Sequence, residues 1–455
     1  MPVFEWRSMM PASADEVFTY HARSGAFRRL APPWQKLRVL EETGDVSGGR
    51  VAFDVWFGPV KRHWVAEMGS AVPGRQFVDR QIDGPFASWE HTHRFAPESA
   101  DRSELIDHIE YSLPAGVLTD MVGEGPAGKT LSRLFRFRHE RTLMDLERHA
   151  VWGERPALTV AIAGASGLIG AHLADYLTTA GHRVVRLVRR ADAGPGEIPW
   201  DPAAGALYPA ALEGVDAVVN LAGVTLAGVW TSSRKRAILE SRVQATQTLV
   251  GAIARMDAPP PVLVNTSAVG AYGSRGGDAI TERTELGSGF LADVCRAWEG
   301  AAAPVRDAGV RLVTTRVGIV VSAAGGALAS MLPAFKAGLG TRFGAGDQYW
   351  AWVSLDDVLA AIEWAIHDEE IDGVVNVTAP EPVTNREFTK TLGRVLRRPA
   401  ALAAPGFVLR HGLGGMGDEM FLASQRALPA RLQDQGLRFA FPELESALRY
   451  ELGRS

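Results

Sequence analysis

Three glycines spaced three residues apart carry the clearest chemical signal in this chain. Gly164, Gly167 and Gly170 follow the apolar run 158–163 and lead into an alanine-rich helical stretch. In a dinucleotide site, the first glycine permits a tight turn, the second lets the backbone approach a pyrophosphate, and the third lets the helix pack closely on the sheet. The sequence therefore predicts a cofactor at the start of this helix. The other residues of the turn that we expect to contact it are Ser166, Leu168 and Ile169.

Two arginines indicate which dinucleotide this site takes. An NAD site usually has an acidic residue at the end of the second strand, about 20 residues past the glycines, where it bonds the ribose hydroxyls. This chain has Arg189 and Arg190 there instead. Because a guanidinium is a planar fork of donors suited to phosphate, we expect both to bond the 2′-phosphate of NADP(H). The alternative is that they are solvated loop residues.

A series of short apolar runs supplies the sheet that must position these residues. The runs alternate with helix-like segments, which is typical of a doubly wound parallel sheet of the Rossmann type. They span residues 158–163, 183–188, 217–221, 262–266, 310–313 and 374–377. The sequence thus predicts an α/β domain over residues 157–380. A helical region over 381–455, beginning at a cap at Thr384, is expected to act as a lid that completes the substrate cleft.

The first 152 residues follow a different pattern. Short stretches of alternating polarity predict antiparallel strands, and a capping box at Ser13 and Glu16 begins a helix. A longer helix is predicted over 128–149, where we expect Arg133, Arg136, Arg138 and Arg141 to form a solvated face. The N-terminal domain is therefore α+β, and a break at 152–156 separates it from the α/β domain.

Composition excludes several classes of protein. With 46% hydrophobic and 22% charged residues in 455, the chain is typical of a globular protein of two or three domains. The net charge of −4 gives no reason to expect a nucleic-acid partner. The single cysteine, Cys295, is expected in the core, and its isolation favours a reducing compartment, with the cytoplasm as the default. We find no signal peptide and no run long enough for a membrane span.

The segment from Leu158 onward resembles the atypical short-chain dehydrogenase/reductases called epimerase-like, sugar-nucleotide epimerase-like or cell-division-inhibitor-like. Beyond the glycines, the similarity rests on the stretches 220–223, 240–243, 266–273, 298–299 and 352–357. The resemblance implies that Leu221 and Ala222, with Gly223, lie along the adenosine side of the cofactor. It also implies that Arg242 reaches the cofactor from its helix.

The catalytic residues of short-chain dehydrogenases are only partly present. Those enzymes use a serine together with a tyrosine whose pKa is lowered by a lysine four residues on. Ser267 occupies the serine position, but the helix near 290–299 has neither a tyrosine nor a lysine. We name Ser267 and Tyr272 as candidate catalytic residues. Glu282 and Asp293 are further polar candidates supported only by position, and Tyr272 is equally consistent with a structural loop aromatic.

The N-terminal domain resembles the helix-grip domains of the START and polyketide-cyclase type, which implies a cavity for a hydrophobic ligand. His91 and His93 would share one strand face, as metal ligands can. Since the sequence offers no third ligand, we expect no metal site and expect both histidines to be exposed or to line the cavity.

Two functions remain open. The first is an NADP-dependent oxidoreductase or epimerase acting on a small or hydrophobic substrate. The second is a non-catalytic NADP(H)-binding protein that regulates the ligand-carrying domain, an alternative favoured by the missing tyrosine and lysine.

Overall fold

The computed structural model describes residues 2–113, 126–153 and 155–454. Contacts divide the described chain into two units, residues 1–156 with 175–181, and residues 157–174 with 182–455. Among the described helices, none is long and apolar enough to cross a membrane.

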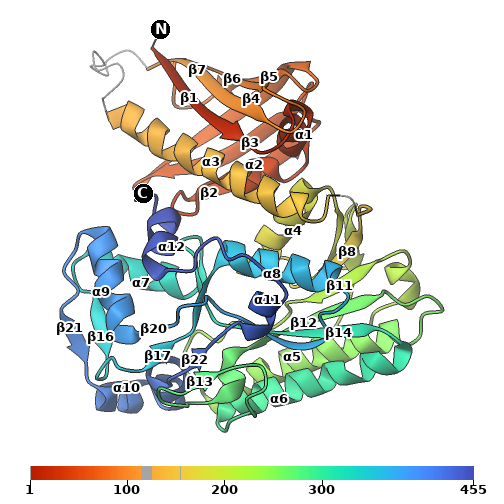
Figure 1. Ribbon diagram of the computed structural model, residues 1–455, viewed down its shortest axis with the longest axis vertical. Helices are drawn as coiled ribbons and strands as arrows, with labels where there is room; N and C mark the ends of the chain where they lie inside the picture. Colours follow the sequence, from red (N-terminus) through yellow and green to blue (C-terminus); the bar gives the residue numbers. More distant parts are fainter. Residues whose placement is uncertain (1, 114–125, 154, 455) are drawn as a thin grey trace. The chain divides into compact units, whose positions relative to one another are not determined.

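The N-terminal unit is a seven-stranded antiparallel sheet with three helices (Figure 1). The order of the strands is β1-β7-β6-β5-β4-β3-β2. The strands are β1 (Val3–Met10), β2 (Leu37–Thr43), β3 (Arg50–Phe57), β4 (Val60–Val72), β5 (Gln76–Asp83), β6 (Ser88–Pro97) and β7 (Ser103–Ser112). The helices are α1 (Ala14–Ala22), α2 (Ala26–Arg29) and α3 (Pro126–Ala150). This arrangement confirms the α+β helix-grip domain.

Two local predictions in this unit have different outcomes. The capping box is confirmed, because the Glu16 N–H donates to Ser13 Oγ at 3.3 Å and the Ser13 N–H donates to Glu16 at 2.8 Å. The prediction that the arginines of α3 form a solvated face is wrong: Arg133, Arg136 and Arg138 are half-buried, and the exposed fraction of Arg141 is 4%. Its guanidinium lies 4.7 Å from the centre of the Phe137 ring, so its flat face packs against an aromatic side chain.

The second unit is built on a seven-stranded parallel sheet, which confirms the Rossmann fold. The order is β10-β9-β8-β11-β12-β14-β19, and each neighbouring pair is parallel. The strands are β8 (Thr159–Ala163), β9 (Arg183–Val188), β10 (Glu197–Pro199), β11 (Ala217–Asn220), β12 (Val262–Ala268), β14 (Arg311–Val317) and β19 (Gly373–Val377). All six runs named in the sequence are strands; β10, only three residues long, was not predicted.

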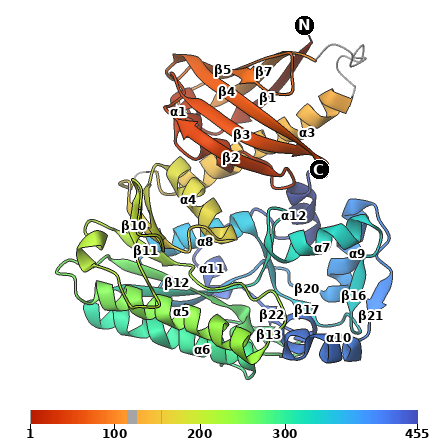
Figure 2. The ribbon, with the colours of Figure 1, turned by 180° about the vertical axis from the view of Figure 1, so that it is seen from behind.

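Helices cover both faces of this sheet. Figures 1 and 2 show α5 (Ser232–Ile253) and α6 (Phe290–Ala302) on one face, with α8 (Leu355–His367) on the other. Helix α4 (Leu168–Ala180) begins directly after β8, and α7 (Gly326–Lys336) follows β15 (Ile319–Val321). The buried core between the sheet and its helices includes Val218, Leu249 and Leu263, each with an exposed fraction of 0%.

The C-terminal region adds short helices and short strand pairs to the second unit. The helices are α9 (Asn385–Leu396), α10 (Gly406–Leu413), α11 (Ala430–Asp434) and α12 (Leu444–Glu451), with a π-helical turn at Gly417–Leu422. The predicted cap at Thr384 is confirmed as a capping box with Glu387. Strand β22 (Arg426–Ala427) pairs with β13 (Ala279–Ile280), which ties this region back to the loop after β12.

Candidate functional site

The turn between β8 and α4 requires glycine at two positions. Gly164 has φ +83°, and a Cβ there would lie 2.7 Å from the backbone of Leu221. A Cβ on Gly170 would lie 2.3 Å from the Gly164 carbonyl oxygen. Both distances are shorter than side-chain carbons tolerate, so the turn can pass beneath the β11 loop and enter α4 only because these side chains are absent.

A cavity of about 780 Å³ opens above this turn. It lies where the strand order reverses, because β8 pairs with β9 on one side and with β11 on the other. Ligands of doubly wound sheets bind at this reversal point. The wall includes Gly164, Ser166, Gly167, Arg189, Arg190, Leu221, Ala222 and Gly223. Of the predicted cofactor residues, Leu168, Ile169, Gly170 and Arg242 are outside this wall.

The loop after β11 is held in place by a buried asparagine. The Asn220 side-chain amide donates to Asn265 Oδ1 at 2.8 Å and to Thr246 Oγ1 at 2.9 Å. Its oxygen accepts the Ala222 N–H at 3.2 Å. Because Asn220 has no exposed surface, these bonds fix Leu221 and Ala222 along the cavity wall rather than contributing a ligand contact themselves.

The end of β9 brings three guanidinium groups to one side of the cavity, those of Arg186, Arg189 and Arg190. Arg190 pairs with Glu197 of β10, and the Gly194 N–H, which donates to Glu197 at 2.8 Å, is the main reason that the pKa of this carboxyl is lowered. Arg189 makes no side-chain hydrogen bond within the part of the chain that the structure describes. The cavity therefore presents one unpaired and one paired arginine beyond β9.

Sequence reasoning missed Glu197, Trp200, Asp201 and Gln244, which also line the cavity. Glu197 is brought there by the pairing of β10 with β9, where it lies opposite Arg186. Gln244 is on α5, two residues past Arg242. The strand β10 has only three residues, which is too short to recognise by periodicity.

Arg242 lies behind the loop and not at the cavity wall. Its guanidinium donates to the carbonyl oxygens of Ile238 at 2.9 Å and Val224 at 3.2 Å, and it lies 5.0 Å from the centre of the Trp298 ring. Burial lowers its pKa. A Cβ on Gly223 would come within 3.1 Å of this side chain, so Arg242 packs directly against the loop that lines the cavity.

Ser267 belongs to a buried polar network at the end of β12. Its hydroxyl donates to Glu299 Oε1 at 2.6 Å, and Glu299 accepts two bonds from Arg316, at 2.9 and 2.7 Å. The exposed fraction of Ser267 is 2%. Cys295 of the adjacent α6 is buried as predicted, and desolvation raises the pKa of its thiol. In this arrangement the Ser267 hydroxyl donates its proton to the Glu299 carboxylate, so it has none to donate to a substrate.

The remaining acid and base candidates also have partners. The Tyr272 hydroxyl donates to Asn376 Oδ1 at 2.7 Å, and burial raises the pKa of this fully buried phenol. Glu282 accepts the Asn376 N–H at 3.0 Å. Asp293 is exposed and pairs with Arg296. Arg316, which bonds the Glu299 partner of Ser267, also lies 4.8 Å from the centre of the Tyr272 ring. The structure thus brings Ser267 and Tyr272 into one neighbourhood, whereas Asp293 is not part of this network.

The C-terminal region contacts the start of α6, the helix on which a short-chain dehydrogenase would carry its tyrosine. Glu419 accepts the N–H groups of Phe290 at 2.9 Å and Leu291 at 2.7 Å. Next to it, a smaller cavity of about 140 Å³ is lined by Gly270, Gly273, Ser274, Ser288, Leu291, Asp418, Glu419, Ala423 and Gln425. Residues after 381 therefore form part of a cleft beyond the end of β12.

His91 and His93 are not exposed, which excludes one of the two expectations for them. Their exposed fractions are 3% and 7%, and both rings lie between the carboxylates of Asp79 and Asp107. The sequence could not show these partners because they come from the neighbouring strands β5 and β7.

Comparison with family models divides the chain in a similar way. Residues 160–378 match the NAD dependent epimerase/dehydratase family, residues 10–135 match the polyketide cyclase / dehydrase and lipid transport family, and residues 404–451 match a domain of unknown function.

Relatives extend the similarity over the whole α/β region. An epimerase family protein of Mycobacterium tuberculosis is 44% identical over 296 residues, which cover 65% of this chain and 98% of that protein. A nucleoside-diphosphate sugar epimerase structure from Corynebacterium glutamicum is 32% identical, with a TM-score of 0.81 over 99% of this chain and 90% of that one. The human epimerase family protein SDR39U1, solved with NADPH, is 32% identical, with a TM-score of 0.60 over 65% of this chain and 99% of that one.

Proposed function

Because the chain belongs to the NAD dependent epimerase/dehydratase family, we propose that it binds NADPH in the 780 Å³ cavity and serves as an oxidoreductase or epimerase for a small molecule. The observation that carries this proposal is the cavity wall itself. It combines a glycine turn at the start of a helix with arginines, rather than an acidic residue, directly after β9.

The residues present fit a dinucleotide phosphate. A Cβ on Gly164 would meet the loop after β11, and Gly167 leaves the start of α4 open for the pyrophosphate. Arg189 and Arg190 would hold the 2′-phosphate, while Leu221 and Ala222 would line the adenosine side. Support also comes from the human relative solved with NADPH. Ser166, Leu168, Ile169, Gly170 and Gly223 would complete the turn and its surroundings, and Arg242 would act by holding the loop.

The reaction would take place beyond the end of β12. A bound nicotinamide supplies a hydride donor or acceptor, and Ser267 would be the hydroxyl next to it, because it lies at the carboxyl end of β12. The residues after 381 would close the substrate cleft, because Glu419 already bonds the first turn of α6. The N-terminal unit, whose match is to polyketide cyclases and lipid transport domains, would hold a hydrophobic ligand.

One observation favours the second candidate, a non-catalytic NADPH-binding protein that regulates the N-terminal unit. The Ser267 proton is donated to Glu299, and the Tyr272 proton is donated to Asn376. Phe290 or Leu291 stands where the tyrosine of short-chain dehydrogenases would be, so neither candidate catalytic hydroxyl has a proton free for a substrate oxygen. Turnover would require Ser267 to leave Glu299.

Calorimetric titration with NADPH and with NADH tests the cofactor. We expect NADPH to bind more tightly, and Arg189→Ala to weaken NADPH by about 10–150-fold, the equivalent of about 1.5–3 kcal/mol for a charge-assisted bond. NADH affinity should stay nearly constant. The matched control is Arg183→Ala, at the exposed opposite end of the same strand. Equal affinities for the two cofactors in the unmodified chain would contradict the arginine assignment.

Oxidation of NADPH by a panel of carbonyl compounds detects an oxidoreductase. Because an epimerase returns the hydride to its own substrate and consumes no NADPH, it is tested in parallel by the conversion of nucleotide sugars. An oxidoreductase should consume NADPH with at least one carbonyl class, and Ser267→Ala should slow that reaction while leaving NADPH affinity unchanged. A Ser330→Ala variant, at an exposed position of α7 outside both cavities, serves as the control. NADPH binding with neither NADPH oxidation nor epimerisation of a nucleotide sugar would favour the regulatory protein.

A further inference from the structure

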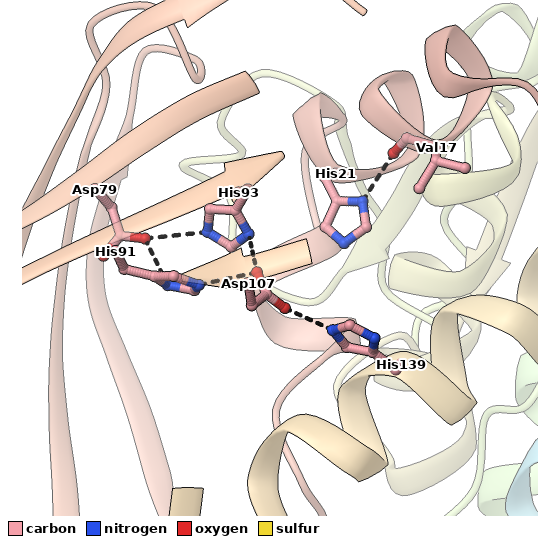
Figure 3. Close-up of polar contacts among 7 residues, drawn as sticks. All are labelled: Val17, His21, Asp79, His91, His93, Asp107 and His139. Atoms are coloured by element: carbon pink, nitrogen blue, oxygen red, sulfur yellow. Dashed lines mark hydrogen bonds and ion pairs between the residues drawn. The ribbon is translucent and has the colours of Figure 1, made fainter. Parts of the chain in front are cut away.

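Strand pairing in the N-terminal unit collects histidines and carboxylates at one place on the sheet (Figure 3). His91 and His93 are two residues apart on β6, so they point to the same face. In the register of the sheet, Asp79 of β5 lies opposite His91, and Asp107 of β7 lies opposite His93. With His139 of α3, which faces Asp107, these residues form the group that we call the His–Asp cluster.

The two carboxylates hold the two imidazoles from opposite sides. Asp79 Oδ2 lies 3.0 Å from His91 Nδ1 and 3.1 Å from His93 Nε2. Asp107 Oδ1 lies 2.9 Å from His91 Nε2 and 2.8 Å from His93 Nδ1. Each imidazole therefore turns one nitrogen toward Asp79 and the other toward Asp107. The nitrogens on the Asp79 side and the Asp79 oxygen lie within 4.8 Å of one another.

We propose that Asp79, His91 and His93 form a binding site for a divalent transition-metal ion. Two imidazoles and one carboxylate are a common ligand set for such ions. Ligand atoms about 2.1 Å from an ion and at right angles to one another lie about 3.0 Å apart, which is the spacing from Asp79 Oδ2 to the two histidine nitrogens. Asp79 Oδ2 is therefore at coordination spacing from both nitrogens, and all three ligand atoms lie within 4.8 Å of one another.

Asp107 provides the outer support that such a site needs. A histidine that binds a metal through one nitrogen almost always donates the N–H of the other to a carboxylate or carbonyl, which fixes the ring. Asp107 Oδ1 accepts from His91 Nε2 at 2.9 Å, and its Oδ2 accepts from His139 Nε2 at 2.8 Å. Asp107 Oδ1 also lies 2.8 Å from His93 Nδ1, but this contact lacks the geometry of a hydrogen bond. Asp107 is thus a positioning residue, and the ion would contact only the three ligands.

Charge and access are consistent with a divalent ion. Asp79 and Asp107 together carry two negative charges. Burial alone would lower the pKa of His91, but these carboxylates raise it to about 9, so the His91 proton balances part of that charge and a divalent cation would take its place. The nearby His21 donates its Nδ1–H to the Val17 carbonyl at 2.8 Å, and burial lowers its pKa to about 3, so it adds no charge. The Asp79 side chain is 14% exposed, which leaves a path for an ion and a water ligand.

Metal titration of the full chain tests this site. The protein is stripped with EDTA and titrated with ZnCl₂ by calorimetry, and with CoCl₂ by visible absorption, because Co²⁺ reports its ligands through its absorption bands. We expect one equivalent to bind in the unmodified chain. Asp79→Asn and His93→Ala should each weaken binding by more than the roughly 10–100-fold that loss of an outer partner costs.

The control is His63→Ala, which removes a histidine paired with Asp54 elsewhere in the same sheet and should leave binding unchanged. If His93→Ala fails to fold, as judged by circular dichroism, Asp79→Asn keeps the test open because the side chain retains its size. Failure of the unmodified chain to take up an equivalent of either ion would overturn the proposal. The proposal would also be overturned if Asp79→Asn bound the metal ion as tightly as the His63→Ala control does.

Discussion

The cofactor cavity and the His–Asp cluster place charged groups in opposite environments. At the cavity, Arg189 makes no side-chain hydrogen bond to the described residues, and the backbone at the start of α4 faces open space. In the cluster, every carboxylate is in contact with imidazoles, and the exposed fractions of His91, Asp107 and His139 are 2–3%. Charged groups that lack protein partners can bind a ligand. Charged groups that pair with one another inside the protein instead stabilise the fold, so the loss of one member destabilises it.

The largest expected effect is the loss of one carboxylate from the cluster. Burial alone would raise the pKa of Asp107, but its contacts with His93, His139 and His91 hold it well below its usual range. In Asp107→Asn the imidazoles lose that negative charge while Asp79 alone remains. Breaking a buried pair in this way costs about 3–5 kcal/mol. In thermal unfolding of the metal-stripped chain, the N-terminal unit of Asp107→Asn should therefore unfold at a lower temperature than that of the unmodified chain.

The control for this variant is Asp101→Asn, because Asp101 bonds Ser99 in an exposed turn of the same sheet. It should unfold like the unmodified chain. If Asp107→Asn and Asp101→Asn unfold at the same temperature, the cluster does not stabilise the N-terminal unit, and the contrast with the cavity is lost. NADPH affinity should be the same in both variants.

The next effect concerns the shape of the glycine turn. In Gly164→Ala, the alanine would have to adopt φ +83°, and its Cβ would lie 2.7 Å from the Leu221 backbone. The left-handed conformation alone costs about 1–2 kcal/mol, and the loop after β11 must move. We expect affinity for NADPH and NADH to fall together, by about tenfold or more, which distinguishes this variant from Arg189→Ala. Calorimetric titration with both cofactors measures it.

Gly214→Ala is matched to this change, since Gly214 has φ +70° with no neighbouring atom within 4 Å of its Cβ position. It should lose similar stability and keep its affinity for both cofactors. An unchanged affinity in Gly164→Ala would show that the turn does not approach a bound dinucleotide.

The contrast between the two regions also explains what could be predicted from the sequence. The glycine turn is local, because Gly164 to Gly170 lie within seven residues and the strand and helix that position them are their direct neighbours. The parallel sheet was equally readable, since buried strands such as β9 and β11 are continuous apolar runs. The fold and one wall of the cavity therefore follow from short stretches of sequence.

The remaining parts depend on contacts between distant residues. Asp79 and Asp107 meet His91 and His93 through the register of three strands, and register is set by packing that no short pattern displays. The strand predicted over 262–266 is confirmed and extends through Ser267, but the bond from Ser267 to Glu299, 32 residues away, was not foreseeable. The same holds for Glu419, which reaches the start of α6 from more than 120 residues along the chain.

The smallest expected effect tests whether the arginine side of the cavity is as open as the contrast implies. Glu197 pairs with Arg190 and lines the same wall, where its charge opposes a 2′-phosphate. Glu197→Gln would release Arg190, so NADPH should bind more tightly, by up to about fivefold, which is the range of an exposed ion pair. NADH, which lacks that phosphate, should be unaffected. Glu213→Gln, an exposed change in the same unit, is the control. Weaker NADPH binding in Glu197→Gln would mean that Glu197 holds Arg190 in its binding position, so that this side of the cavity, like the His–Asp cluster, is organised by its own ion pair.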